Sequence, residues 1–98
     1  MQAILITFDQ AHYHRIIEML ERNNCRGFTS WPIVNGRGSN SGEPHLGSHA
    51  WPSENSAIIT IVEDERAANI MARLKALDEE SPKLGLRAFQ WQIGRAHV

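Results

Sequence analysis

Short apolar runs alternate with amphipathic segments along this chain, and their order predicts four strands and two helices. Residues 2–8 (QAILITF) are rich in Ile, Leu and Phe and too few for a buried helix, so we expect a buried strand there. Residues 25–34 form the second predicted strand, in which Pro32 indicates a sheet edge or a bulge. Residues 57–62 are the most β-prone stretch, and residues 86–93 alternate between two faces as the last strand.

Two segments between these strands have helical periodicity. The first follows Asp9, whose carboxylate can cap a helix, and ends near Asn23 and Asn24, which tolerate the left-handed conformation of a C-terminal cap. The second follows Asp64 as its predicted cap and ends at residues 81–85 (SPKLG). Each helix has one apolar face, made of Tyr13, Ile16, Ile17 and Leu20 in the first and Ala67, Ile70, Met71, Leu74 and Leu77 in the second.

The order βαββαβ predicts an α+β fold of the ferredoxin-like type, a four-stranded antiparallel sheet with both helices on one face. We expect a single domain over residues 1–93 with a long loop at 35–55, followed by a disordered or vector-derived tail at 94–98. The other sheet face has no cover within the chain, so self-association is expected, with Phe89 and Trp91 packing on the sheet or at a subunit interface.

Composition narrows the class of protein. The formal net charge of the 98 residues is −1 and no basic patch is visible, so we expect no nucleic-acid partner. The single cysteine, Cys25, cannot form an internal disulfide, and residues 1–9 resemble neither a signal peptide nor a membrane span. These features predict a cytoplasmic protein.

The long loop is the strongest candidate for a binding segment, because loops of this length in a compact domain are usually functional or disordered. Trp31 and Trp51 flank it, as hydrophobic anchors or as a stacking platform for the flat ring of a ligand. Within it, Glu43, His45 and His49 form the one plausible metal set. Solvated loop histidines are the simpler interpretation, and zinc or copper held between subunits is the alternative.

The sequence contains little that indicates an enzyme. No Ser-His-Asp or Cys-His arrangement, no paired carboxylates in an apolar setting and no Walker-type loop is present, so we do not expect an enzyme. His12 and His14 are two residues apart on the first predicted helix, point in different directions, and are both expected at the surface.

Three short motifs occur at matching places in a known family. Gly27-Phe28-Thr29 lies in the second predicted strand, Val34-x-Gly36-x-Gly38 opens the loop, and Val62-x-Asp64-Glu65 ends the third strand. With the long loop between the second and third strands, this pattern resembles the PII signal-transduction superfamily over residues 2–93. The resemblance implies a trimeric ferredoxin-like domain whose long loop contacts target proteins.

The resemblance also implies an adenine-nucleotide site between subunits. The matching positions are Thr29, Gly36, Arg37, Gly38 and Val62, where glycine N–H groups and the arginine would contact phosphate. The second phosphate loop of the family, Thr-Gly-x-x-Gly-Asp-Gly-Lys, is absent. In its place is DEESPKLGLRAF, in which Gly85, Lys83 and Arg87 could substitute. This departure argues against the family's usual mode of ATP binding, whereas a smaller nucleotide such as AMP or ADP could still be held; the candidate effectors are ADP, AMP and ATP.

The leading hypothesis is therefore a homotrimeric PII-like regulator whose adenine-nucleotide effector orders the loop. The loop would signal to a target protein such as a membrane transporter or an enzyme. Tyr13 is the sole tyrosine and lies outside the loop, so regulation by tyrosine uridylylation is not expected. The alternative is a metal-binding trimer similar to the metal-tolerance protein CutA, which would use the loop histidines.

Overall fold

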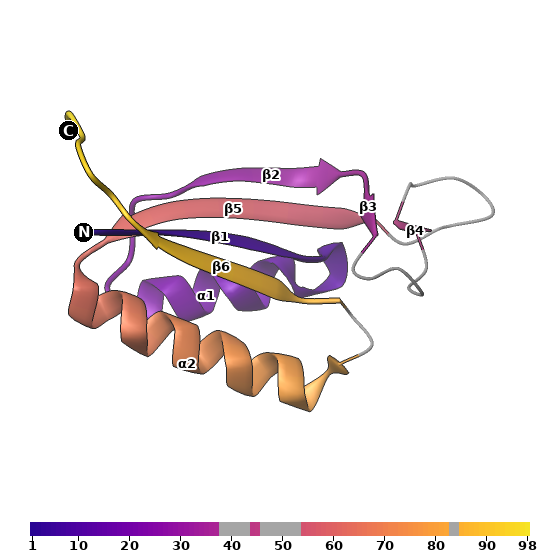
Figure 1. Cartoon of the computed structure of the whole chain (residues 1–98). Helices are drawn as coiled ribbons and strands as arrows, with labels where there is room; N and C mark the ends of the chain where they lie inside the picture. Colours follow the sequence, from indigo (N-terminus) through magenta and orange to yellow (C-terminus); the bar gives the residue numbers. More distant parts are fainter. Residues whose placement is uncertain (38–43, 46–53, 83–84) are drawn as a thin grey trace.

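The protein forms one four-stranded antiparallel sheet with two helices packed on one of its faces (Figure 1). The computed structural model describes residues 1–37, 44–45, 54–82 and 85–98. The strand order is β2-β5-β1-β6. The elements are β1 (Gln2–Asp9), η1 (Gln10–His12, a 3-10 helix), α1 (Tyr13–Arg22), β2 (Thr29–Val34), β3 (Gly36–Arg37), β4 (Pro44–His45), β5 (Asn55–Val62), α2 (Asp64–Glu80) and β6 (Arg87–Gln92). The predicted ferredoxin-like fold is confirmed.

The core lies between the sheet and the two helices. In β1 and β5 the even-numbered residues point to the helices, because side chains alternate along a strand. Tyr13 and Ile17 complete the apolar face of α1 at its half-buried margin, as the periodicity predicts. The fully buried apolar side chains of this core are Ile4, Ile6, Phe8, Ile16, Leu20, Ile58, Ala67, Ile70 and Leu74.

The predicted long loop contains a short antiparallel pair of its own. Gly36 of β3 pairs with His45 of β4, and Arg37 pairs with Pro44. Both strands lie beyond the end of β2, outside the main sheet (Figure 1). Pro32 lies where the β2–β5 register shifts, on an edge strand, so both features that Pro32 indicated are present.

The first helix begins and ends as the sequence predicts. The carboxylate of Asp9 accepts a hydrogen bond from the backbone N–H of Ala11 at 2.8 Å, although the first turn that it caps is the 3-10 helix η1. At the other end Asn24 has φ 58°, and the Asn24 N–H donates to the Glu21 carbonyl. The Cys25 N–H donates to the Leu20 carbonyl at 2.8 Å, which completes a Schellman cap.

This cap explains why the second strand starts later than predicted. The expectation of a strand from residue 25 is wrong for residues 25–28, and β2 begins at Thr29. The Cys25 N–H belongs to the helix cap, and its side chain is buried in the core. The Gly27 carbonyl accepts from the Thr60 hydroxyl at 2.7 Å, so a side chain on β5 takes the place of a strand partner.

The predicted cap of the second helix is also wrong. Glu63 occupies the N-cap position without a side-chain hydrogen bond, and Asp64 lies in the first turn. The Asp64 carboxylate is 3.1 Å from the Met1 ammonium and accepts from Gln2 Nε2 at 3.2 Å. These partners lower the pKa of Asp64. An acid in the first turn still interacts favourably with the helix dipole, so the residue type is right for the helix start.

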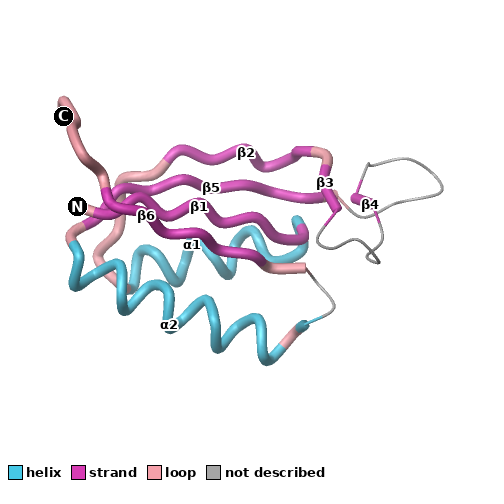
Figure 2. The backbone as a smooth tube through the Cα atoms, viewed as in Figure 1, coloured by secondary structure: helices cyan, strands magenta, loops and turns pink. Residues whose placement is uncertain are grey.

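None of the described residues covers the sheet face away from the helices (Figure 2). Cross-strand pairs place apolar side chains from all four strands on it, in rows such as Ile59–Leu5–Phe89 and Ile61–Ala3–Trp91. Trp91 is 45% exposed and Phe89 55% exposed. We call this surface the open face; its apolar residues are Ala3, Leu5, Trp31, Ala57, Ile59, Ile61, Phe89 and Trp91.

Thr60 holds the segment that leads into β2. Its buried hydroxyl donates to the Gly27 carbonyl and lies 3.0 Å from the Cys25 thiol. We expect Thr60→Val, which keeps the shape and removes the hydroxyl, to lower the free energy of unfolding by about 1–3 kcal/mol, since it leaves buried polar groups unpaired.

Urea denaturation measures this loss, and Thr7→Val on the half-buried open-face side of β1 is the matched control, with an expected change within about 0.5 kcal/mol. Equal stabilities of the two variants would show that the Thr60 hydrogen bond does not hold this segment.

Candidate functional site

Among the described site residues that the family resemblance implies, all but Val62 lie at two opposite edges of the sheet. Thr29 is on β2 and Gly36 and Arg37 form β3, which continues from the β2 edge. Arg87 is the first residue of β6, the other edge strand, and Gly85 lies two residues before it. Neighbouring strands are about 4.8 Å apart, so three spacings separate the two edges by roughly 14 Å. One copy of the chain therefore does not bring the two groups together.

Thr29 on β2 and Val62 on the neighbouring strand β5 differ in how far their side chains are exposed. Thr29 is exposed and pairs with Ile59 on the open-face side. Val62, at the end of β5, is only 6% exposed and packs in the core, so its side chain is not available to a ligand. Gly38 lies outside the described residues.

At the β6 edge, Gly85 has φ 68°, a left-handed conformation that glycine adopts without strain. Arg87 is exposed, pairs with Thr7, and points to the open face. Its Nη1 donates to the Leu86 carbonyl at 2.7 Å, which uses one of the five N–H donors of the guanidinium. The remaining donors can still bind an anion.

The predicted metal set remains a prediction. His45 is part of β4, whereas Glu43 and His49 lie outside the described residues. Within the ranges that the structure describes, no cluster of three or more His, Cys, Asp or Glu residues could hold a metal ion.

His12 is buried, contrary to the surface position expected for it, whereas His14 is exposed as predicted. The 3-10 turn of η1 directs the His12 side chain inward, and it is 5% exposed. Its Nδ1 atom has no hydrogen-bond partner in the described part of the chain. Burial, followed by the charge of Arg15, lowers the pKa of His12, while Asp9 and Glu80 oppose this shift.

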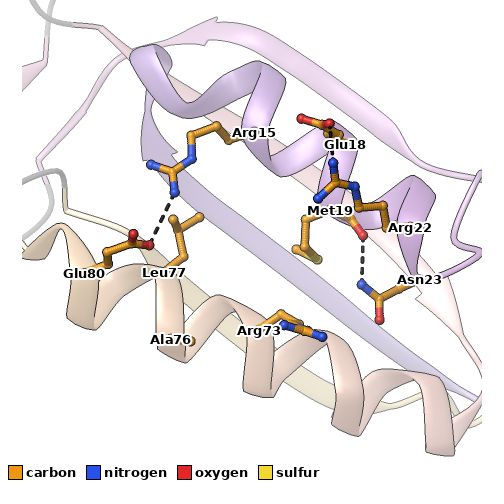
Figure 3. Close-up of a pocket in the computed structure, with 9 residues that line it drawn as sticks. All are labelled: Arg15, Glu18, Met19, Arg22, Asn23, Arg73, Ala76, Leu77 and Glu80. Atoms are coloured by element: carbon orange, nitrogen blue, oxygen red, sulfur yellow. Dashed lines mark hydrogen bonds and ion pairs between the residues drawn. The ribbon is translucent and has the colours of Figure 1, made fainter.

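A groove that the sequence did not indicate runs between α1 and α2 (Figure 3). Its volume is about 380 Å³. Arg15, Arg22 and Arg73 line it together with two glutamates. One signal was readable in the sequence, because Arg73 has Asn69 and Leu77 rather than an acid at the helical neighbours four residues away.

Comparisons with solved structures define the class of protein. A PII-like signalling protein from Thermus thermophilus is 26% identical with a TM-score of 0.66, covering 92% of this chain and 83% of that one. CPII from Thiomonas intermedia, a nitrogen regulatory PII-like protein solved with ADP, AMP and bicarbonate, is 19% identical with a TM-score of 0.70. That match covers 96% of this chain and 88% of CPII. The chain thus shares the fold of PII-like proteins.

The family model for nitrogen regulatory protein P-II matches residues 1–96, and this chain belongs to that family. The search of curated proteins gives no significant match. In the described part of the chain, neither helix has the length and apolar character needed to span a membrane.

The buried His12 makes stability depend on pH. Because its pKa in the folded state lies below the ordinary value of 6.5, the unfolded chain binds the proton more readily. We therefore expect full stability above pH 6.5 and a progressive loss as the pH falls through 6.5 towards the lowered pKa. Urea denaturation at a series of pH values on both sides of 6.5 measures this dependence.

His12→Gln removes the titrating group and is expected to flatten the pH dependence, whatever it does to stability at high pH. His14→Gln, on the exposed side of α1, is the control and should retain the wild-type slope. A wild-type slope in His12→Gln would show that other groups cause the effect.

Proposed function

We propose that this protein is a homotrimeric regulator that binds an adenine nucleotide between its subunits. The observation that carries the proposal is the position of the candidate residues on opposite edges of one sheet, in a chain of the P-II family. If the β2 edge of one copy lies beside the β6 edge of the next, Arg37 and Arg87 can contact one ligand from two sides.

The open face supports the assembly. Exposed aromatic side chains from β2 and β6 lie on the same apolar surface as the aliphatic residues of β1 and β5. Contiguous apolar surfaces of this kind usually mark an interface. A second and third copy of the chain would cover this face and hold the edge strands of neighbouring subunits close together.

The candidate arginines favour a ligand that carries phosphate. A guanidinium pairs with phosphate through two parallel hydrogen bonds, and Arg87 keeps free donors at the edge of the open face. CPII, which shares the fold, was solved with ADP, AMP and bicarbonate. Because the Thr-Gly-x-x-Gly-Asp-Gly-Lys phosphate loop is absent from this sequence, we assign AMP or ADP, rather than ATP, as the effector.

Signalling would pass through the segment between β2 and β5. A nucleotide that binds one conformation of this segment more tightly shifts the population towards it, and a target protein reads that conformation. The role we propose is therefore regulatory rather than catalytic, and it is exerted in the cytoplasm on a target such as a transporter or an enzyme.

The assembly can be tested by placing a charge on the open face. Trp91→Glu places a charge on the open face, and we expect it to convert the trimer to monomers because burying an unpaired carboxylate is unfavourable. Sedimentation equilibrium measures the mass. Ala72→Glu adds the same charge on the exposed side of α2 and should leave the trimer intact. A trimeric Trp91→Glu variant, or a monomeric wild type, would refute the proposed assembly.

The nucleotide site can be tested by calorimetric titration with AMP, ADP and ATP. We expect AMP or ADP to bind more tightly than ATP. Arg37→Ala and Arg87→Ala should each weaken binding about tenfold or more, since each removes a charged hydrogen bond, while the mass of the assembly stays the same. Arg66→Ala on α2 removes an equal charge elsewhere and serves as the control. Absence of heat with all three nucleotides, or unchanged affinity in both site variants, would contradict the assignment.

A further inference from the structure

The groove between α1 and α2 is open to solvent on the helical side of the molecule. The charged side chains that line it are exposed, whereas Met19 and Leu77 at its floor are partly buried and pack against the core. The open face lies on the other side of the sheet (Figure 2). Covering the open face by further copies would therefore leave the groove accessible.

The positive charge in the groove is not balanced. Arg15 is 3.3 Å from Glu80, an ion pair that links the two helices at one end of the groove. Arg22 is 2.8 Å from Glu18 on the same helix. For Arg73, the described residues offer no acidic partner. Three arginines and two glutamates leave the groove with one positive charge in excess.

The free charge and the apolar floor lie next to each other. Figure 3 shows Arg73 on the α2 side of the groove, with Arg22 and the C-cap residue Asn23 at the end of α1 across from it. Met19, Ala76 and Leu77 supply apolar surface between the helices. The Arg22–Glu18 pair is highly exposed, with side chains 77% and 60% accessible, so it is weak and Arg22 can exchange its partner.

We propose that this groove binds a small organic anion, with its carboxylate or phosphate group on Arg73 and Arg22 and its apolar body on Met19, Ala76 and Leu77. The guanidinium fork suits either head group, because both present two oxygens in the required geometry. The volume of about 380 Å³ lies within the range of small-molecule sites. This site is separate from the nucleotide site proposed above, since none of its residues lies on a sheet edge.

Heteronuclear NMR of the purified full chain tests the proposal, with phenyl phosphate, benzoate and inorganic phosphate as probes. We expect saturable shifts of the Arg73 Nε–H and Leu77 methyl signals with the two aromatic anions. Inorganic phosphate should bind at least roughly threefold more weakly than phenyl phosphate, because it cannot use the apolar floor. The tighter of the two aromatic probes identifies the preferred head group.

Arg73→Gln should weaken binding of both aromatic anions about tenfold, since it removes a charged hydrogen bond from an exposed side chain without disturbing the core. Arg26→Gln, on the exposed segment before β2, removes the same charge outside the groove and should bind as the wild type does. Shifts that do not saturate, unchanged affinity in Arg73→Gln, or equal affinity for inorganic and phenyl phosphate would each overturn the proposal. If the protein failed to bind nucleotides but still bound the aromatic anions in the groove, the proposed nucleotide site would be wrong and the groove proposal would hold.

Discussion

The inner strand β1 is apolar on both of its faces, and the rest of the structure follows from that constraint. Ile4, Ile6 and Phe8 point to the helices, while Ala3 and Leu5 point the other way. Two helices cover one face and nothing in the described chain covers the second. Burial of apolar surface is the main driving force of folding and association. The fold buries one face of β1 under the helices and leaves apolar side chains on the other face, which favours association with further copies. Our proposed ligand site depends on that assembly, because its two groups of residues lie on separate edges.

Much of the fold could be predicted because the spacing of apolar residues along the sequence reflects which side chains are buried. The alternation of β1 and the apolar faces of both helices were readable, and Asn24 marked its helix end correctly. The errors occurred where a local hydrogen bond decides the structure. The Cys25 N–H is part of the Schellman cap of α1, so β2 does not begin at Cys25. The Asp64 carboxylate pairs with the Met1 ammonium and does not cap α2. The surface position predicted for His12 was wrong because His12 lies in the 3-10 helix η1. A 3-10 helix has fewer residues per turn than an α-helix, so its side chains point in different directions.

The candidate site was less predictable than the fold. Motif resemblance proposed Thr29, Arg37 and Arg87 as site residues, but a motif gives no distance between residues, and the side chain of Val62 lies in the core. The groove required the structure, because its walls come from two helices that are far apart in the sequence. A missing acidic neighbour around Arg73 was a weak signal, since isolated surface arginines are common.

Both termini lie at the end of the sheet remote from β3 and β4 (Figure 1). The Ile93 N–H donates to the Met1 carbonyl at 3.1 Å, which fixes the start and the end of the folded chain side by side. An affinity handle or fluorophore attached after Val98 would therefore emerge away from β3 and β4. Immobilising the protein through its C-terminus would leave β3 and β4 on the side that faces the solution. An N-terminal extension would instead replace the free ammonium that pairs with Asp64.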